Sequence, residues 1–181
     1  MLLKDYIPNV DQRFKNIFFS GISFDSSKTR KKNIFFAIKG NKFDGNNYID
    51  KAIKKGANII ITEKKYKKKK NKTIFLYTSN VRKLLANVSF KILNSKPKKL
   101  IAVTGTNGKS SIADFYYQIL RFNKKNVASI GTLGVKSKNF NLNLQNTTID
   151  PIQLSQILSK LKKKGIDNVI MEASSHGLKQ N

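Results

Sequence analysis

The sequence predicts an α/β fold with two domains, and three observations predict it. Short apolar segments of strand length alternate with segments whose apolar residues recur at helical spacing. A polar stop from Asn94 to Pro97 separates two such series. In the second series, a glycine-containing loop stands between a strand-like and a helix-like segment. That order favours a parallel sheet whose strand ends carry functional loops.

The first half of the chain predicts a small α/β domain over residues 1–96. Its strands are expected at 17–19, 34–38, 59–61 and 74–77. One helix is expected from Tyr48 to its stop at Gly56. A second helix carries an apolar stripe from Val81 to Ile92, behind an N-cap at Ser79 or Asn80.

The second half predicts a more regular alternation of strand and helix over residues 97–181. Strands are expected at 100–103, near 127–130 and at 168–172. The helix after the glycine loop is expected to pack through Ile112, Phe115, Tyr116, Ile119 and Leu120. Another helix begins at the N-cap Asp150, with Pro151 in its first turn, and ends at Gly165. Strand, helix and strand in this order predict a parallel sheet that binds ligands at the carboxyl ends of its strands.

The chain is strongly basic, with a net charge of +26 from 36 Lys+Arg against 10 Asp+Glu. Such a balance favours an anionic partner. The basic residues are nearly all lysines spread along the chain, and the dense run Lys64–Lys70 is interpreted as a solvated loop. Because a nucleic-acid surface favours arginine and interleaved aromatic residues, we expect no specific nucleic-acid partner.

Composition also limits the cellular setting. The absence of cysteine excludes a disulfide framework and a thiolate metal site. No apolar run approaches the roughly 18 residues that a membrane span needs. The first residues lack the basic-then-apolar layout of a secretory signal. We therefore expect a cytoplasmic protein with no membrane partner.

The segment IAVTGTNGKSS, residues 101–111, has the chemistry of a phosphate-binding loop. Gly105 and Gly108 let backbone N–H groups turn toward a phosphate, Lys109 meets its outer oxygens, and the Ser110 hydroxyl can ligate Mg²⁺. The spacing is shorter than in a Walker A loop, because Val103 stands where that loop has its first glycine. The alternative is a polar strand-to-helix turn in which Gly-Lys-Ser occurs by chance.

Glu172 ends an apolar strand downstream, where phosphate-loop enzymes place an acid that holds a metal ion or its water. The alternative is a solvated acid at a strand end. Ser174, Ser175 and His176 follow, but no nucleophile-elbow pattern or acidic orienting residue accompanies them. A positioning role is therefore favoured over hydrolase chemistry. On local grounds alone, the polar loops 25–27 and 40–45 are interpreted as turns. The loop 146–148 is either a turn or part of a site, because it is expected on the same sheet edge as the glycine loop.

Taken together, these segments resemble the Mur ligase family, and within it the MurE type. The matching stretches are FDSS, NIFFAIKGNKFDGNNYIDKAIKKGANIIITE, VTGTNGKSS, IGTLG, NTTIDP and MEASSHGLKQ. The short glycine-loop spacing is the one this family uses. The resemblance implies a P-loop ATPase domain and ATP-dependent addition of the third amino acid, diaminopimelate or lysine, to UDP-N-acetylmuramoyl-L-alanyl-D-glutamate in peptidoglycan synthesis. The reaction would pass through an acyl phosphate.

The resemblance also implies ATP and Mg²⁺ as cofactors and assigns site residues. The ATP-binding residues would be Gly105, Thr106, Asn107, Gly108, Lys109, Ser110 and Ser111, with Lys109 catalytic. The metal would be held by Ser110 and Glu172. The uridine end of the substrate would contact Phe24, Ser26, Asn41, Lys42 and Phe43, and the muramoyl-peptide end Asn146, Thr147, Thr148, Ser174 and Gln180. Ser27 stands where the family usually has arginine, and Ser110 and Ser111 stand where it usually has threonines.

Two rival interpretations remain. One is a related ligase such as a folylpolyglutamate or cyanophycin synthetase, and the other is a non-catalytic binder of anions or nucleic acid. The stretches NTTIDP and SSHGL favour the muramoyl enzyme. Family members are much longer, so we expect the rest of the ATPase domain and the amino-acid-binding domain beyond Asn181. We therefore expect residues 1–181 alone to be inactive as a ligase and poorly soluble, and the full-length enzyme to be a monomer.

Overall fold

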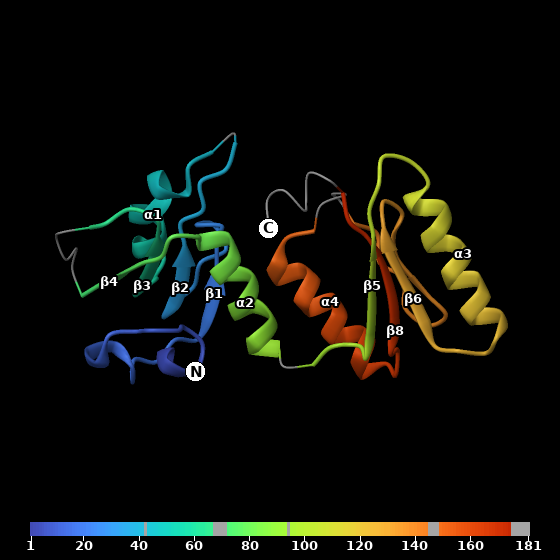
Figure 1. Ribbon diagram of the computed structural model, residues 1–181. Coiled ribbons are helices and arrows are strands. Elements are labelled where there is room, and N and C mark those ends of the chain that lie inside the picture. The colour runs from blue at the N-terminus through green and yellow to red at the C-terminus, as the bar shows by residue number, and fades with distance from the viewer. Residues whose placement is uncertain (42, 67–71, 94, 145–148, 175–181) are drawn as a thin grey trace. The chain divides into compact units, whose positions relative to one another are not determined.

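The computed structural model describes residues 1–41, 43–66, 72–93, 95–144 and 149–174. The chain divides into two compact units, Met1–Ile92 and Leu93–Asn181. Each unit contains one four-stranded sheet with helices packed beside it (Figure 1). The predicted α/β fold class is confirmed. No helix among the described residues is both long enough and apolar enough to cross a membrane.

The sheet of the first unit is entirely parallel. Its strands lie in the order β1 (Gly21–Ser23), β2 (Asn33–Phe36), β3 (Ile59–Thr62) and β4 (Ile74–Tyr77). Every residue of β2 and β3 is buried. Inner strands of a parallel sheet are covered on both faces, which explains their unbroken apolar sequence.

The two helices predicted for the first unit are present as α1 and α2, whereas three short 3₁₀ helices were not predicted. The short 3₁₀ helices η1 (Leu3–Asp5) and η2 (Gln12–Phe14) precede the sheet, and η3 (Gly45–Tyr48) leads directly into α1 (Ile49–Lys54). The helix α2 (Val81–Leu93) begins behind Asn80, whose side chain accepts a hydrogen bond from the Lys83 N–H at 2.8 Å. One core cluster joins β2, β3 and α1 through Phe35, Ala37, Ile49, Ala52, Ala57 and Ile60.

The second unit has a mixed sheet in which three strands are parallel. Its strands are β5 (Lys99–Val103), β6 (Val127–Gly131), β7 (Gly134–Ser137) and β8 (Asn168–Glu172). They lie in the order β5-β8-β6-β7, and only the hairpin pair β6 and β7 is antiparallel. Because β8 lies between β5 and β6, the carboxyl ends of these three strands share one edge.

Two helices cover this sheet, and Figure 1 shows them on opposite sides of it. The helix α4 (Pro151–Lys163) is capped by Asp150, which accepts a hydrogen bond from the Gln153 N–H at 2.9 Å. It forms the main core of the unit with the sheet, through Ala128, Ile130, Val135, Ile157, Leu158, Leu161, Ile166 and Val169. The helix α3 (Lys109–Phe122) lies against β5, β6 and β8.

The prediction of which face of α3 packs against the sheet is wrong. The helix is buried through Ala113 and Tyr117, whereas Ile112, Phe115 and Ile119 are exposed, and so is Phe122 at its end. The apolar stripe exists at helical spacing, but no described residue covers it. The buried side chains of this helix are instead those of Ala113 and Tyr117.

Two strands differ from expectation as well. The segment around Phe18 forms only an isolated bridge with Leu2, and the strand of the sheet is β1, three residues further on. The strand β7 was not predicted at all. Both β1 and β7 are three or four residues long and partly polar, so their sequences carry little strand signal.

Candidate active site

The glycine loop joins the end of β5 to the start of α3. Gly105 and Gly108 have φ angles of +149° and +79°, conformations that favour glycine. A Cβ built on Gly108 would meet no atom within 4 Å, so its backbone conformation, rather than lack of space, calls for glycine. Gly108 is the N-cap residue of α3, and no side chain caps that end. The positive end of the helix and its first N–H groups therefore face the loop.

Lys109 folds back over this loop. Its ammonium group donates hydrogen bonds to the carbonyl oxygens of Gly105 at 2.7 Å and Thr106 at 3.1 Å. A positive charge is thereby held beside the N-terminus of α3. Both features attract an anion with several oxygens, such as a phosphate chain.

Ser110 and Glu172 meet at the carboxyl edge of the sheet. Val103, the last residue of β5, is the register partner of Glu172, the last residue of β8. The Ser110 hydroxyl donates a hydrogen bond to Glu172 Oε2 at 2.9 Å. The structure thus brings together the two residues that the sequence suggested as metal ligands.

Thr132, which follows β6, also contacts Glu172, although its sequence pattern did not indicate a role. Its backbone N–H donates to Oε1 at 3.4 Å and its hydroxyl to Oε2 at 3.3 Å. Gly131 makes this approach possible, because a Cβ there would lie 2.0 Å from Glu172 Oε1. Both residues belong to the stretch IGTLG, which marked a strand end but could not show that β8 lies beside β6.

The donor set fits Mg²⁺. A hydroxyl and a carboxylate are oxygen ligands, and Mg²⁺ in nucleotide sites typically rests on one or two protein ligands, with phosphate and water completing its shell. Within the described ranges, no group of three or more His, Asp or Glu residues forms a larger metal-binding cluster.

The candidate substrate residues of the first unit lie beyond the ends of β1 and β2. Phe24, Asn41 and Phe43 are exposed, whereas Ser26 is buried. Asp25 accepts hydrogen bonds from the Ser27 N–H at 2.8 Å and its hydroxyl at 2.7 Å. The Ser27 hydroxyl bond is the main reason why the pKa of Asp25 lies below its usual value.

Several sequence candidates are not placed. Lys42, Asn146, Thr147, Thr148 and Gln180 lie outside the described residues, as do Ser175 and His176. Ser174 is described and lies two residues beyond the end of β8.

Two family models match the chain. The model described as Mur ligase family, catalytic domain, matches residues 19–90, and the one described as Mur ligase middle domain matches residues 103–181. Curated relatives are named UDP-N-acetylmuramoyl-L-alanyl-D-glutamate–2,6-diaminopimelate ligase. The relative from Rickettsia conorii is 41% identical over 179 residues, covering 95% of this chain and 36% of the relative. The relative from Buchnera aphidicola is 37% identical over 188 residues, covering 99% and 37%.

Solved structures of Mur ligases are also similar to this chain. A structure of a UDP-N-acetylmuramoyl-L-alanyl-D-glutamate–2,6-diaminopimelate ligase is similar with a TM-score of 0.82 and 26% identity, covering 99% of this chain and 37% of that one. The MurF ligase from Thermotoga maritima in complex with ADP has a TM-score of 0.52 and 26% identity, covering 85% and 32%. This chain thus spans about a third of the length of these proteins. Since the two family models together account for most of its residues, the chain belongs to the Mur ligase family.

Proposed function

We propose that this chain provides the ATP-binding loop and the UDP-muramoyl-binding domain of a ligase that adds the third amino acid to UDP-N-acetylmuramoyl-L-alanyl-D-glutamate. The observation that carries the proposal is the arrangement of Lys109, Ser110 and Glu172 around the N-terminus of α3. The names of relatives at 37–41% identity support this substrate and favour diaminopimelate over lysine as the added amino acid.

The proposed reaction has two steps. The substrate's glutamyl carboxylate attacks the γ-phosphorus of ATP, which forms an acyl phosphate and releases ADP. The amine of the amino acid then attacks the acyl carbon, so that the amide forms and inorganic phosphate leaves. Phosphoryl transfer of this kind depends mainly on positioning and on charge stabilisation.

The residues of this chain have distinct roles in the first step. The N–H groups of residues 105–111 would hold the phosphate chain, and the Lys109 ammonium would offset charge on its outer oxygens. Ser110 and Glu172 would hold Mg²⁺, which when bound neutralises negative charge on the phosphate oxygens. Thr132 donates to the same carboxylate and keeps it directed toward Ser110.

The remaining assignments concern the carboxylate substrate. Phe24, Ser26 and residues 41–43 would contact its uridine end, and residues 146–148, Ser174 and Gln180 its muramoyl-peptide end. Ser27 cannot replace the arginine usual in the family, because its hydroxyl donates to Asp25 and it carries no charge. We therefore propose that the substrate contact made by that arginine is missing in this chain or is made by another residue.

Calorimetric titration with ADP in the presence of Mg²⁺ tests the nucleotide site. A charge-assisted contact contributes enough that Lys109→Ala should weaken ADP binding by about ten- to a hundredfold. Lys125→Ala, which removes an exposed lysine beyond the far end of α3, is the matched control and should leave ADP binding unchanged. Equal affinities for Lys109→Ala and the unsubstituted chain would contradict the proposed phosphate loop.

A further inference from the structure

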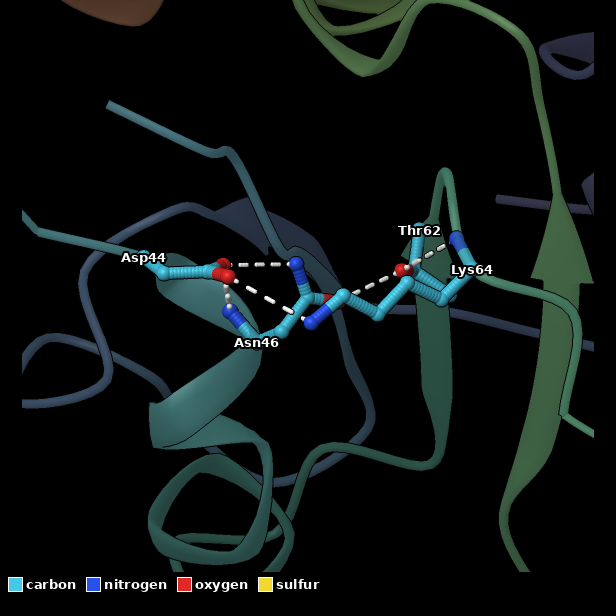
Figure 2. Close-up of polar contacts among 4 residues, drawn as sticks. All are labelled: Asp44, Asn46, Thr62 and Lys64. Carbon is cyan, nitrogen blue, oxygen red and sulfur yellow. Dashed lines mark hydrogen bonds and ion pairs between the residues drawn. The ribbon is translucent and has the colours of Figure 1, made fainter. Parts of the chain in front are cut away.

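A closed network of polar side chains lies at the carboxyl edge of the first unit's sheet, formed by Asp44, Asn46, Thr62 and Lys64 (Figure 2). The backbone N–H and the side-chain amide of Asn46 donate to Asp44 Oδ1 at 2.8 and 2.6 Å. Thr62 donates to Asn46 Oδ1 at 2.6 Å. The Lys64 N–H donates to the Thr62 hydroxyl at 3.1 Å, and its ammonium lies 3.4 Å from Asp44 Oδ2. We call this the Asp44–Lys64 network.

The network fixes the orientation of Asn46. Thr62 is the last residue of β3 and only 1% exposed, so its hydroxyl is a rigid donor held by the sheet. The oxygen of the Asn46 amide accepts from Thr62 while its nitrogen donates to Asp44. A rotated amide would oppose both partners, because its donor and acceptor would exchange places. Asn46 therefore ties Asp44 to the end of β3.

Asp44 is also one end of the loop that follows β2. It forms a β-bridge with Lys39, and the Gly40 N–H donates to the Phe43 carbonyl at 2.8 Å. The Gly45 N–H donates to the Ile38 carbonyl at 2.8 Å. A Cβ on Gly45 would lie 2.7 Å from Ile38 backbone atoms, so this end of the loop is closely packed.

The element that these contacts hold is a surface loop rather than part of the core. Its tip carries Asn41 and Phe43, and Phe43 is 70% exposed. A phenyl ring and an amide on one braced loop suit a planar base with hydrogen-bonding edges. The carboxyl edge of a parallel sheet is also where such folds bind their ligands.

We infer that Thr62 and Asn46 are positioning residues, which hold Asn41 and Phe43 where they contact the uridine-nucleotide end of the substrate. The inference rests on the proposed function, because it assumes that a uridine nucleotide binds at this edge. A loop that is already ordered loses less conformational entropy when the ligand binds. Loss of the Thr62 hydroxyl would leave Asn46 Oδ1 without its donor and release this restraint.

The test uses the whole chain with three substitutions. Thr62→Val keeps the shape of the side chain and removes the hydroxyl, whereas Thr62→Ser keeps the hydroxyl. Thr73→Val is the matched control, because Thr73 is also buried and lies in the same unit but outside the Asp44–Lys64 network. Binding of UDP-N-acetylmuramoyl-L-alanyl-D-glutamate is measured by calorimetry, and thermal unfolding is measured for each variant.

We expect Thr62→Val to weaken binding of this ligand by about three- to tenfold, the range that one net hydrogen bond supports. Thr62→Ser should restore the affinity, and Thr73→Val should leave it unchanged even if it lowers the unfolding temperature as much. In the unliganded protein, the amide NMR signals of Asn41 and Phe43 should shift in Thr62→Val and remain in place in Thr73→Val. ADP affinity should be the same in all three variants.

The outcomes separate this inference from the proposed function. If the unsubstituted chain binds the ligand and Thr62→Val binds it equally well, the positioning role is overturned while the proposed function stands. Equal weakening by Thr73→Val would overturn it too, since general destabilisation would then explain the effect. If the unsubstituted chain does not bind the ligand, the proposed function fails and the inference fails with it.

Discussion

The Ser110 hydroxyl donates a hydrogen bond of 2.9 Å to the Glu172 carboxylate, although the two residues are 62 positions apart in the chain. The parallel pairing of β5 with β8 brings them together, because Val103 and Glu172 are register partners at the ends of these strands. Ser110 then follows in the first turn of α3. A candidate metal-binding pair thus depends on sheet topology as well as on the glycine loop.

The first prediction concerns this pair. Glu172→Gln keeps the size of the side chain but removes its charge, so Mn²⁺ binding in the presence of ADP should weaken by about tenfold or more. Ser110→Ala should weaken it in the same direction. Electron paramagnetic resonance of free Mn²⁺ gives the affinity directly. Asp114→Asn, at a half-exposed carboxylate of α3 that pairs with Lys136, is the control, and an equal loss there would point to general charge effects rather than a site.

The second prediction concerns Gly131. A Cβ at this position would lie 2.0 Å from Glu172 Oε1, so Gly131→Ala must displace the carboxylate or the strand end. Overpacking of this kind costs about 1–3 kcal/mol of unfolding free energy unless the Glu172 side chain turns away. Urea unfolding measures that cost, and Mn²⁺ affinity reports the displacement. Gly108→Ala is the comparison, because a Cβ at Gly108 would meet no atom within 4 Å. Any loss of stability in this variant should therefore come from the backbone φ of +79° alone. A fully stable Gly131→Ala with unchanged Mn²⁺ affinity would refute the steric argument.

The third prediction concerns pH. The Asn46 side chain, followed by its backbone N–H and by Lys64, holds the pKa of Asp44 below its usual value. The folded state therefore favours the ionised carboxylate, and this stabilisation is complete above the unfolded pKa of about 3.9. It is lost as pH falls from there through the lowered folded pKa. The difference in urea midpoint between the unsubstituted chain and Asp44→Asn should shrink over that window. A difference that stays constant from pH 6 to pH 3 would exclude Asp44 as its source.

The fourth prediction concerns the exposed apolar stripe of α3. Ile112, Phe115, Ile119 and Phe122 follow each other at helical spacing on a face that no described residue covers. Such a surface promotes association. The double substitution Phe115→Ser and Phe122→Ser should reduce self-association in analytical ultracentrifugation, with little loss of stability because both side chains are exposed. If the sedimentation profile does not change, this stripe does not drive association.

Local signals in the sequence predicted much of the second unit. Asp150 and Gly165 marked the ends of α4, and the glycines and Lys109 marked the loop before α3. The face of α3 could not be predicted in this way, because periodicity shows a stripe but not what lies opposite it. The contact of Thr132 with Glu172 was equally hidden, since it depends on β8 lying beside β6. Likewise the Asp44–Lys64 network joins Asp44, in a loop that was interpreted as a turn, to the end of β3.

The most direct test of the account is amide NMR of the whole chain titrated with two ligands. We predict that ADP with Mg²⁺ shifts the signals of residues 105–111 and of Thr132, because Thr132 contacts Glu172, and leaves Asn41 and Phe43 in place. We predict that UDP-N-acetylmuramoyl-L-alanyl-D-glutamate shifts the signals of Asn41 and Phe43. Shifts from ADP that are spread over the lysine-rich surface and spare residues 105–111 would contradict the central claim that this loop holds the nucleotide.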